Sequence, residues 1–353
     1  MITVRLAEED EDVDNLPHFD FTKMSAINTC PKWGIIRYHL HKTFSNSARA
    51  MALEAGEACH QVFSAGRVFD LYNYGNLVYP NEPYKDLAVT RSVEMFGADR
   101  TEQMMQRFTM DGEDERTRLL NGAIFILESS GFYDDPSDKR RTLDNLIEAC
   151  IAYLDRYEFG VNVPYIRGDF VGIENAFRII IEGDEIGKIA FTGRIDGFHC
   201  RKNNHNDPYI EENKTASRLS DAWEQSFDTS HQVTGYTVAG STIIGSIVDR
   251  AVIRGVQLPQ PKVYSDGVVS VTVTRKDQHF QQWANWVNYT VKLFREFYEQ
   301  PVNAPMFTHS CNRFFRPCSF IPLCCAPVAE QEEIINEEMV VEEWSPLHDK
   351  AGD

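Results

Sequence analysis

The sequence predicts an α/β protein in which a mixed central sheet is flanked by helices and preceded by a helical N-terminal region. Three observations support this class. Apolar residues recur at helical spacing before about residue 160, short β-branched runs follow Pro164, and one amphipathic segment interrupts those runs. With 42% hydrophobic and 12% aromatic residues, the 353-residue chain can bury a large core, which excludes a globally disordered protein.

The N-terminal region is predicted to be helical. One helix is expected over Phe21–Phe44, with Ser25 as its N-cap, and a second over Ser47–Phe63. The segment from about Asp86 to Tyr157 is also predicted to be mostly helical, because its apolar residues recur at helical spacing. Breaks in it are expected at Asp111–Gly112 and Asp134–Pro136, and its packed face carries Leu143, Leu146, Ile147, Cys150, Ile151 and Leu154.

After Pro164 the pattern becomes that of strands. Alternating and β-branched residues predict three successive strands that form a meander, followed by a helix and more strand. The meander is expected over Gly172–Ile181, Lys188–His199 and Tyr209–Thr215, with turns at Glu182–Asp184 and Lys202–Pro208. Helices are expected over Gln225–Ile244 and Gln278–Tyr298, and further strands over Val248–Val256 and Gly267–Thr274.

The net charge of −18 is concentrated in two terminal segments. Six acidic residues lie between Glu8 and Asp14, and nine lie between Glu330 and Asp353 with Lys350 among them. These segments carry −6 and −8, which leaves −4 for the rest of the chain. We therefore expect an acidic lead-in over residues 1–18, a single domain over 19–329 and an acidic tail over 330–353. The charge argues against a large basic face that binds nucleic acid non-specifically.

The eight cysteines are unevenly placed, because Cys311, Cys318, Cys324 and Cys325 crowd together near the C-terminus. No apolar run approaches the length of a membrane span, and the N-terminus lacks the order of a signal peptide. We therefore expect a cytoplasmic protein with reduced thiols and no membrane partner. In that compartment a terminal cysteine cluster indicates a metal site rather than a disulfide framework.

One stretch of the predicted meander contains residues suited to phosphodiester hydrolysis. It reads Gly193-Arg-Ile-Asp196-Gly and then, after the polar turn, Glu211-Glu212-Asn-Lys214-Thr. Two carboxylates at the ends of adjacent strands can bind one Mg²⁺ or Mn²⁺, and a lysine beside them can neutralise developing charge. Side chains alternate along a strand, so Glu212 and Lys214 share a face while Glu211 points away. A solvated surface hairpin is the alternative interpretation.

The pair GRIDG and EENKT resembles motifs II and III of the RecB-type nucleases of the PD-(D/E)xK superfamily. That group includes the RecB and AddB nuclease domains, the CRISPR-adaptation exonucleases and many phage exonucleases. The resemblance implies a restriction-endonuclease-like core, a Mg²⁺ or Mn²⁺ cofactor, and catalytic roles for Asp196, Glu212 and Lys214. It also implies a helical part at about 20–160, a catalytic core at about 161–300 and a cysteine cluster at 311–325.

Further residues match motifs of the same family. The segment that ends at His60 resembles its G-x-x-x-H motif, in which the histidine is a metal ligand in addition to Asp196 and Glu212. Gln232 and Tyr236 resemble its Q-x-x-x-Y motif, and their spacing places both on one helical face, where they can orient a strand or the lysine. Glu174 matches a frequent family glutamate, for which metal-site support and simple solvation both remain open.

A subset of that family binds a [4Fe–4S] cluster through one cysteine near the start of the nuclease domain and three near its end. Cys30, Cys311, Cys318 and Cys324 resemble this ligand set. Six residues separate Cys311 from Cys318, a wider spacing than in many relatives, and Cys325 competes with Cys324 for the fourth place. A zinc site and free thiols are the alternatives. Cys59, Cys150 and Cys200 are expected in the core or on the surface.

The resemblance thus implies a metal-dependent deoxyribonuclease, expected to be an exonuclease on single-stranded DNA or duplex ends, in recombination, repair or phage replication. A non-catalytic nuclease-fold subunit that binds DNA or a partner is the alternative. The presence of Asp196, Glu212 and Lys214 favours catalysis, since a decayed site would be expected to lose at least one of them. The compact form without a helicase resembles phage-encoded members, which act in the host cytoplasm. The acidic tail is interpreted as solvated, as a docking peptide for a replication or recombination protein, or as a DNA mimic.

Overall fold

The computed structural model describes residues 2–8, 11–44, 51–260, 267–313 and 316–344. The chain divides into two compact units. Among the described residues, unit 1 comprises 2–8, 11–44, 176–193, 276–313 and 316–344, and unit 2 comprises 51–175, 194–260 and 267–275. Helices flank a central sheet of mainly antiparallel strands with parallel pairs among them, so the predicted α/β class is confirmed.

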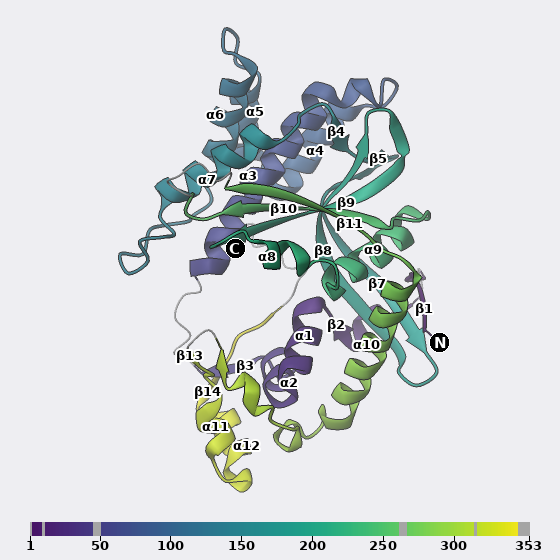
Figure 1. The fold of residues 1–353 in the computed structure, drawn as a ribbon, viewed down its shortest axis with the longest axis vertical. Coiled ribbons are helices and arrows are strands. Elements are labelled where there is room, and N and C mark those ends of the chain that lie inside the picture. Colours follow the sequence, from purple (N-terminus) through teal and green to yellow (C-terminus); the bar gives the residue numbers. More distant parts are fainter. Residues whose placement is uncertain (1, 9–10, 45–50, 261–266, 314–315, 345–353) are drawn as a thin grey trace. The chain divides into compact units, whose positions relative to one another are not determined.

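Unit 2 begins with a group of helices that pack around one long helix (Figure 1). They are α3 (Met51–Tyr74), α4 (Tyr84–Phe96), α5 (Ala98–Phe108), α6 (Glu115–Glu128) and α7 (Leu143–Arg156), with a short 3₁₀ turn at Gly75–Leu77. The predicted breaks fall between α5 and α6 and between α6 and α7, where Asp114 and Thr142 cap the helices that come next. On the predicted face of α7, Leu146, Cys150 and Leu154 are buried.

The strands of unit 2 come after these helices. They are β4 (Asn162–Pro164), β5 (Ile166–Arg167), β6 (Phe170–Val171), residues 173–175 of β7 (Ile173–Gly183), residues 194–201 of β8 (Gly187–Arg201), β9 (Asn204–Ala216), β10 (Arg250–Gln257) and β11 (Val268–Thr274). The helices α8 (Asp221–Gln225) and α9 (His231–Ile244) lie between β9 and β10 in sequence. This connection returns the chain to the end of the sheet at which β9 begins, so β10 pairs with β9 in parallel. The β8–β9 and β10–β11 pairs are antiparallel.

Strand β9 has helices on both of its faces. Lys214 Nζ donates to Gln232 of α9 on one face, and Tyr153 of α7 donates to Asn213 on the other. Gly240 of α9 lies against Ile210, so its missing side chain permits close packing of helix on strand. Alternate residues of β9 therefore face different helices, as the strand period requires.

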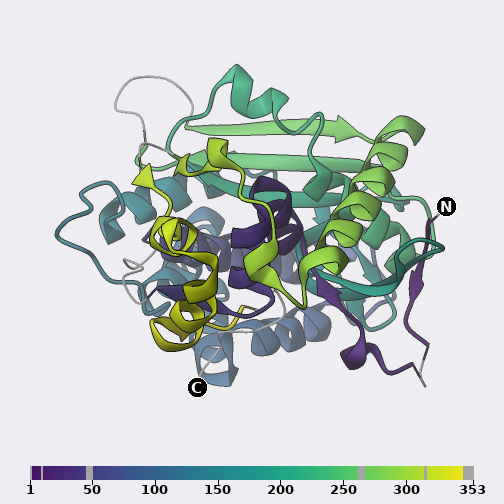
Figure 2. The ribbon, with the colours of Figure 1, turned by 90° about the horizontal axis from the view of Figure 1, so that it is seen from below.

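Unit 1 combines strands with the helices of both chain ends. Its strands are β1 (Ile2–Leu6), β2 (His18–Phe19), β3 (Lys42–Phe44), residues 176–183 of β7 (Ile173–Gly183), residues 187–193 of β8, β12 (Asn312–Arg313), β13 (Arg316–Pro317) and β14 (Met339–Val341). Its helices are α1 (Phe21–Thr29), α2 (Pro31–Tyr38), α10 (Asp277–Phe297), α11 (Ile321–Cys325) and α12 (Val328–Glu337). Short 3₁₀ turns occur at Val13–Asn15, Pro301–Asn303 and Thr308–Ser310. Figure 2 shows the purple α1 and α2 beside the yellow-green α10, which they contact.

The first predicted helix differs from the structure in its cap and its length. Asp20, not Ser25, caps α1, because the Asp20 carboxylate accepts a hydrogen bond from the Lys23 N–H at 2.9 Å. The helix ends at Thr29, and Pro31 then occupies the first turn of α2, where a missing N–H is tolerated. The predicted second helix, Ser47–Phe63, begins outside the described residues and continues to Tyr74.

Two further boundaries were wrong. The segment Lys202–Pro208, expected to be a turn, belongs largely to β9, which begins at Asn204 and pairs with Arg201 there. The segment Gln225–Ile244, expected to be one helix, is interrupted, because Ser230 caps a new helix by accepting from the Val233 N–H. Across the part of the chain that the structure describes, no helix is both long and apolar enough to cross a membrane.

The expected acidic lead-in and tail are partly structured. Residues Ile2–Leu6 form β1, which pairs with Ile179–Gly183 of β7, and β14 pairs with β3. Ile335 and Met339 are buried, at 5% and 4% exposure, because they share one apolar cluster with Ile36 and Phe320. A fully solvated tail over 330–353 is therefore wrong for its described part, while residues 345–353 lie outside the described residues.

Candidate metal centre

The predicted metal ligands of unit 2 come from separate elements. His60 lies on α3, Asp196 on β8 and Glu212 on β9, and Glu174 is the second residue of β7. One ligand atom each of His60, Glu174 and Asp196 lies within 4.8 Å of the other two, whereas Glu212, the third predicted ligand, is not part of this group. His60 is more than a hundred positions from the two carboxylates in sequence, so the fold itself assembles the group.

Asp196 is held by a backbone group and by the histidine. Its Oδ2 accepts a hydrogen bond from the Asn213 N–H at 2.6 Å, and its Oδ1 lies 3.5 Å from His60 Nδ1. The neighbouring Gly197 approaches His199 so closely that an added Cβ would meet the imidazole at 2.6 Å. Any larger residue at position 197 would displace this part of β8, and with it the neighbouring Asp196.

Glu212 and Lys214 share one face of β9, as predicted from the strand period. Lys214 Nζ donates to Glu212 Oε1 at 2.5 Å and to Gln232 Oε1 at 3.3 Å. Gln232 Nε2 donates in turn to the Tyr236 hydroxyl at 3.1 Å. The other carboxylate oxygen of Glu212, Oε2, is buried and has no hydrogen-bond partner among the described residues. A buried, unpaired carboxylate oxygen is costly, and a bound cation would satisfy it.

Glu174 adopts a strained backbone conformation. Its φ is 48°, in the left-handed region that residues with side chains rarely occupy. Arg91 donates to the carbonyl oxygens of both Ile173 and Glu174, and the Ser64 hydroxyl donates to Glu174 Oε1 at 2.7 Å. These contacts fix the carboxylate beside His60, and strain of this kind is concentrated at functional sites. Of the two interpretations left open for Glu174, the contacts favour metal-site support.

The site places three buried carboxyl groups, those of Glu174, Asp196 and Glu212, beside the cationic groups of His60 and Lys214. Burial, together with the nearby charge of Asp196, raises the pKa of Glu174 and of Glu212 to about 7 each. Burial alone would lower the pKa of His60, but the charge and hydrogen bond of Asp196 raise it to about 9. Burial also opposes ionisation of Asp196, yet His60 and Lys214 hold its pKa below the usual value. A divalent cation in this position would offset the crowded carboxylates.

The opposite face of β9 carries a buried charge network. Glu211, which is fully buried, pairs with Arg67 of α3, and its Oε2 accepts from Arg254 Nε of β10 at 2.9 Å. The Tyr153 hydroxyl donates to Asn213 at 2.6 Å and lies 3.4 Å from Glu211 Oε1. Glu211 is therefore a structural residue, and its network fixes the strand on which Glu212 lies.

Three residues at this site were not predicted from the sequence. Ser64 lies four positions after His60, so helical spacing could have placed both on one face of α3. Arg67 and Arg91 gave no such signal, because their partners, Glu211 and the Glu174 carbonyl, are distant in sequence.

The four predicted cluster cysteines are neighbours in unit 1. Burial raises the pKa of Cys324 to about 11, opposed by the charge of Lys32 and aided by the nearby thiols of Cys30, Cys318 and Cys311. Cys318 N–H also donates to the Cys311 carbonyl at 2.8 Å. Cys325 is exposed, so Cys324 is the better candidate for the fourth place. Cys59, Cys150 and Cys200 were expected in the core or on the surface, and the structure buries all three in the core of unit 2.

Comparison with known proteins identifies no family. No protein-family model matches the chain, and no curated protein matches it. Among solved structures, the crystal structure of SSO0001 is 17% identical and aligns over 44% of this chain with a TM-score of 0.26. The alignment spans 59% of the length of that protein. A likeness this weak supports no conclusion about fold or function.

Proposed function

We propose that this chain is a metal-dependent deoxyribonuclease of the RecB-type PD-(D/E)xK kind, acting as an exonuclease on DNA in recombination, repair or phage replication. The supporting observation is the convergence of His60, Glu174 and Asp196 within 4.8 Å. Glu212 has a buried, unpaired oxygen, and burial together with the nearby charge of Asp196 raises the pKa of its carboxyl group. Carboxylate oxygens with one imidazole suit Mg²⁺ or Mn²⁺. We place its action in the cytoplasm, which for a phage-encoded enzyme is that of the host.

The residues of the site would divide the work of hydrolysis. His60, Asp196 and Glu212 would hold the ion, and Glu174 would support it. When bound, the ion supplies a Lewis acid and lowers the pKa of its water. Lys214, oriented by Glu212 and Gln232, would supply a cation near the charge that develops on the phosphate. Tyr236 accepts from Gln232 and so fixes the amide that orients the lysine.

The proposal is tested by incubating the purified protein with end-labelled single-stranded and duplex DNA, in Mg²⁺, Mn²⁺ or EDTA. Cleavage is expected with either metal and not with EDTA. Glu212→Gln should lose it, because an amide is a weaker ligand than a carboxylate. Glu224→Gln, at a half-buried position of α8 that is not among the grouped metal ligands, should retain it. A folded wild-type protein that cuts none of these substrates would refute the proposal and favour the non-catalytic subunit.

The hydroxyl that supports Glu174 gives a milder expected effect. Ser64→Ala removes this donor and should weaken Mn²⁺ binding by about tenfold or more, as losses of ligand-orienting groups do. Titration calorimetry with Mn²⁺ measures this. Ser92→Ala, also buried in unit 2 but bonded to Thr101, is the matched control and should leave the Mn²⁺ affinity unchanged. Equal Mn²⁺ affinity in Ser64→Ala and wild type would show that the contact between Ser64 and Glu174 does not support metal binding.

We also propose that Cys30, Cys311, Cys318 and Cys324 bind a [4Fe–4S] cluster. In support, the thiols of Cys30, Cys311 and Cys318 lie close enough to Cys324 to raise its pKa. Cys318 and Cys324 also pack against the apolar cluster that contains Ile36 and Phe320.

The cluster predicts a colour. Protein purified without oxygen should be brown and absorb broadly near ~400 nm, and Cys→Ala at any of the four positions should bleach it. The same substitutions should destabilise the protein, because ligand binding energy is shared with folding. Cys325→Ala, at an exposed neighbour, should do neither. Iron analysis decides: a colourless protein without iron, or with one zinc, would rule out the cluster and leave the nuclease proposal standing.

The folded part of the C-terminal segment limits which of its residues could contact a partner protein. Gln331, Ile335 and Met339 are buried within unit 1, so they cannot serve as docking side chains without unfolding it. Docking of a replication or recombination protein would therefore use the exposed acidic residues of α12 and those at positions 338, 342 and 343.

A further inference from the structure

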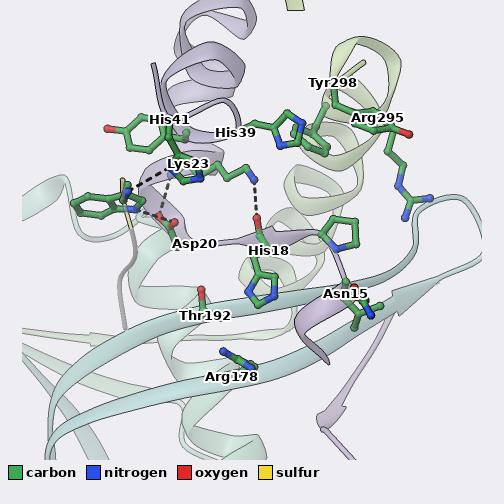
Figure 3. Close-up of a pocket in the computed structure, with 15 residues that line it drawn as sticks. Asn15, His18, Asp20, Lys23, His39, His41, Arg178, Thr192, Arg295 and Tyr298 are labelled. Carbon is green, nitrogen blue, oxygen red and sulfur yellow. Dashed lines mark hydrogen bonds between the residues drawn. The ribbon is translucent and has the colours of Figure 1, made fainter. Parts of the chain in front are cut away.

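Unit 1 contains a cavity that the proposed hydrolysis does not use. Its volume is about 870 Å³, within the range of small-molecule sites. Residues of β2, α1, α2 and the β7–β8 hairpin line it, together with the C-terminal end of α10 and Trp344 (Figure 3). All of these belong to unit 1, so the cavity is complete within that unit.

The floor of the cavity holds a buried ammonium group. Lys23 is 7% exposed, and its Nζ donates to the His18 carbonyl at 2.8 Å (Figure 3). Within the described chain no carboxylate lies within ion-pair distance of this Nζ, and the nearest groups include the rings of Phe19 and Phe294. Burial lowers the pKa of Lys23 to about 8, against the opposing charge of Asp20. A buried cation without an anionic partner is unfavourable, and a bound anion would compensate it.

The other charged groups that line the cavity do not neutralise the Lys23 ammonium group. Asp20, the acidic residue among the described lining residues, is already engaged, since its two oxygens accept from Lys23 N–H and from Trp344 Nε1. Arg178 pairs with Asp14 at 2.7 Å. Arg295 lines the rim and makes no ion pair with any residue that the structure describes. Lys23 and Arg295 are therefore the cations available to a ligand.

The walls of the cavity are aromatic. Phe294 and Tyr298 stack with ring centroids 5.5 Å apart, and Tyr38 meets Trp344 edge to face at 5.9 Å. Rings of this kind provide surfaces on which a planar base can stack. His41, which also lines the cavity, has a φ of 55°, and its Nδ1 accepts from Trp344 N–H at 3.3 Å. Strained residues of this kind are concentrated at ligand sites.

We propose that this cavity binds a nucleotide, either a free mononucleotide or the phosphorylated end of a DNA strand. The phosphate would compensate Lys23 and Arg295, and the base would stack on the aromatic walls. Both halves of such a ligand find a complementary surface within one cavity. The proposal stands on unit 1 and needs no nuclease activity.

The test is calorimetric titration of the full-length protein in EDTA, with dTMP, 5′-phosphorylated (dT)₄ and inorganic phosphate as probes. Saturable binding of dTMP or of the oligonucleotide is expected, tighter than that of phosphate. Lys23→Met and Arg295→Gln should each weaken it about tenfold or more, the loss expected for a charge-assisted hydrogen bond. Tyr298→Ala should weaken dTMP binding by about tenfold and leave phosphate binding unchanged.

Matched variants on the same helix serve as controls. Lys292→Gln and Tyr289→Ala alter exposed residues of α10 that do not line the cavity, and both should bind as wild type does. Glu212→Gln should also bind normally, which separates this site from the metal centre. If the oligonucleotide binds more tightly than dTMP and dTMP displaces it, the strand end is the ligand; the reverse order assigns the free nucleotide. Absence of saturable binding by both, or equal affinity for phosphate and dTMP, would overturn the proposal.

Discussion

Asp196→Asn is expected to reduce metal-dependent DNA cleavage by about a thousandfold or more. Charge stabilisation by a catalytic metal amounts to several kcal/mol, and each ~1.4 kcal/mol is a factor of ten in rate. Asparagine keeps the shape of the side chain and can still accept from the Asn213 N–H, so unit 2 should stay folded. It cannot offer the charged oxygen that lies beside His60 and Glu174. Single-turnover cleavage of end-labelled DNA in Mn²⁺ measures the loss.

A matched substitution separates chemistry from folding. Asp207→Asn changes the same side chain on β9 at a position that is half exposed and paired with Arg250, away from the ligands. It should cleave at the wild-type rate. If Asp196→Asn cleaved as fast as Asp207→Asn, with circular dichroism unchanged in both, Asp196 would not be a metal ligand and the nuclease proposal would fail.

Glu211→Gln should lower the free energy of unfolding by about 3–5 kcal/mol, because it removes the anion that pairs with the buried Arg67 and the partly buried Arg254. Arg67 is 2% exposed and Glu211 is 0% exposed, so solvent cannot replace the lost charge. Urea unfolding of the full chain, followed by fluorescence, measures the change. Asp155→Asn breaks an exposed pair with Arg116 and should have a much smaller effect, since solvent screens it. Equal stability of Glu211→Gln and wild type would show that the network is not a major source of stability.

The alternation of β9 could be predicted from the sequence because it depends only on the strand period. That period placed Glu212 and Lys214 on one face and Glu211 on the other, and the contacts of both faces agree. The convergence of His60 with Asp196 could not be derived from spacing, since it depends on how α3 crosses the strands. For those residues the motif resemblance carried the prediction, and the structure brings their ligand atoms together.

The errors arose where local sequence signals were ambiguous. Asp20 and Ser25 are both good capping residues, and the choice between them depends on where packing against α10 begins the helix. In the C-terminal segment, Ile335 and Met339 lie four positions apart among glutamates, and the overall acidity obscured this apolar face. The left-handed φ of Glu174 has no local signal, because Arg91, more than eighty positions earlier, maintains it.

The two occupied faces of β9 limit how this protein can change during evolution. A single-residue insertion or deletion between Tyr209 and Glu211 would exchange the faces, placing Glu211 toward Gln232 and Glu212 toward Arg67. Because both faces change at once, such a variant would lose the metal site and the buried charge network together. Length variation among homologues is therefore expected at the exposed Lys202–Asn203 turn and not in the strand after it.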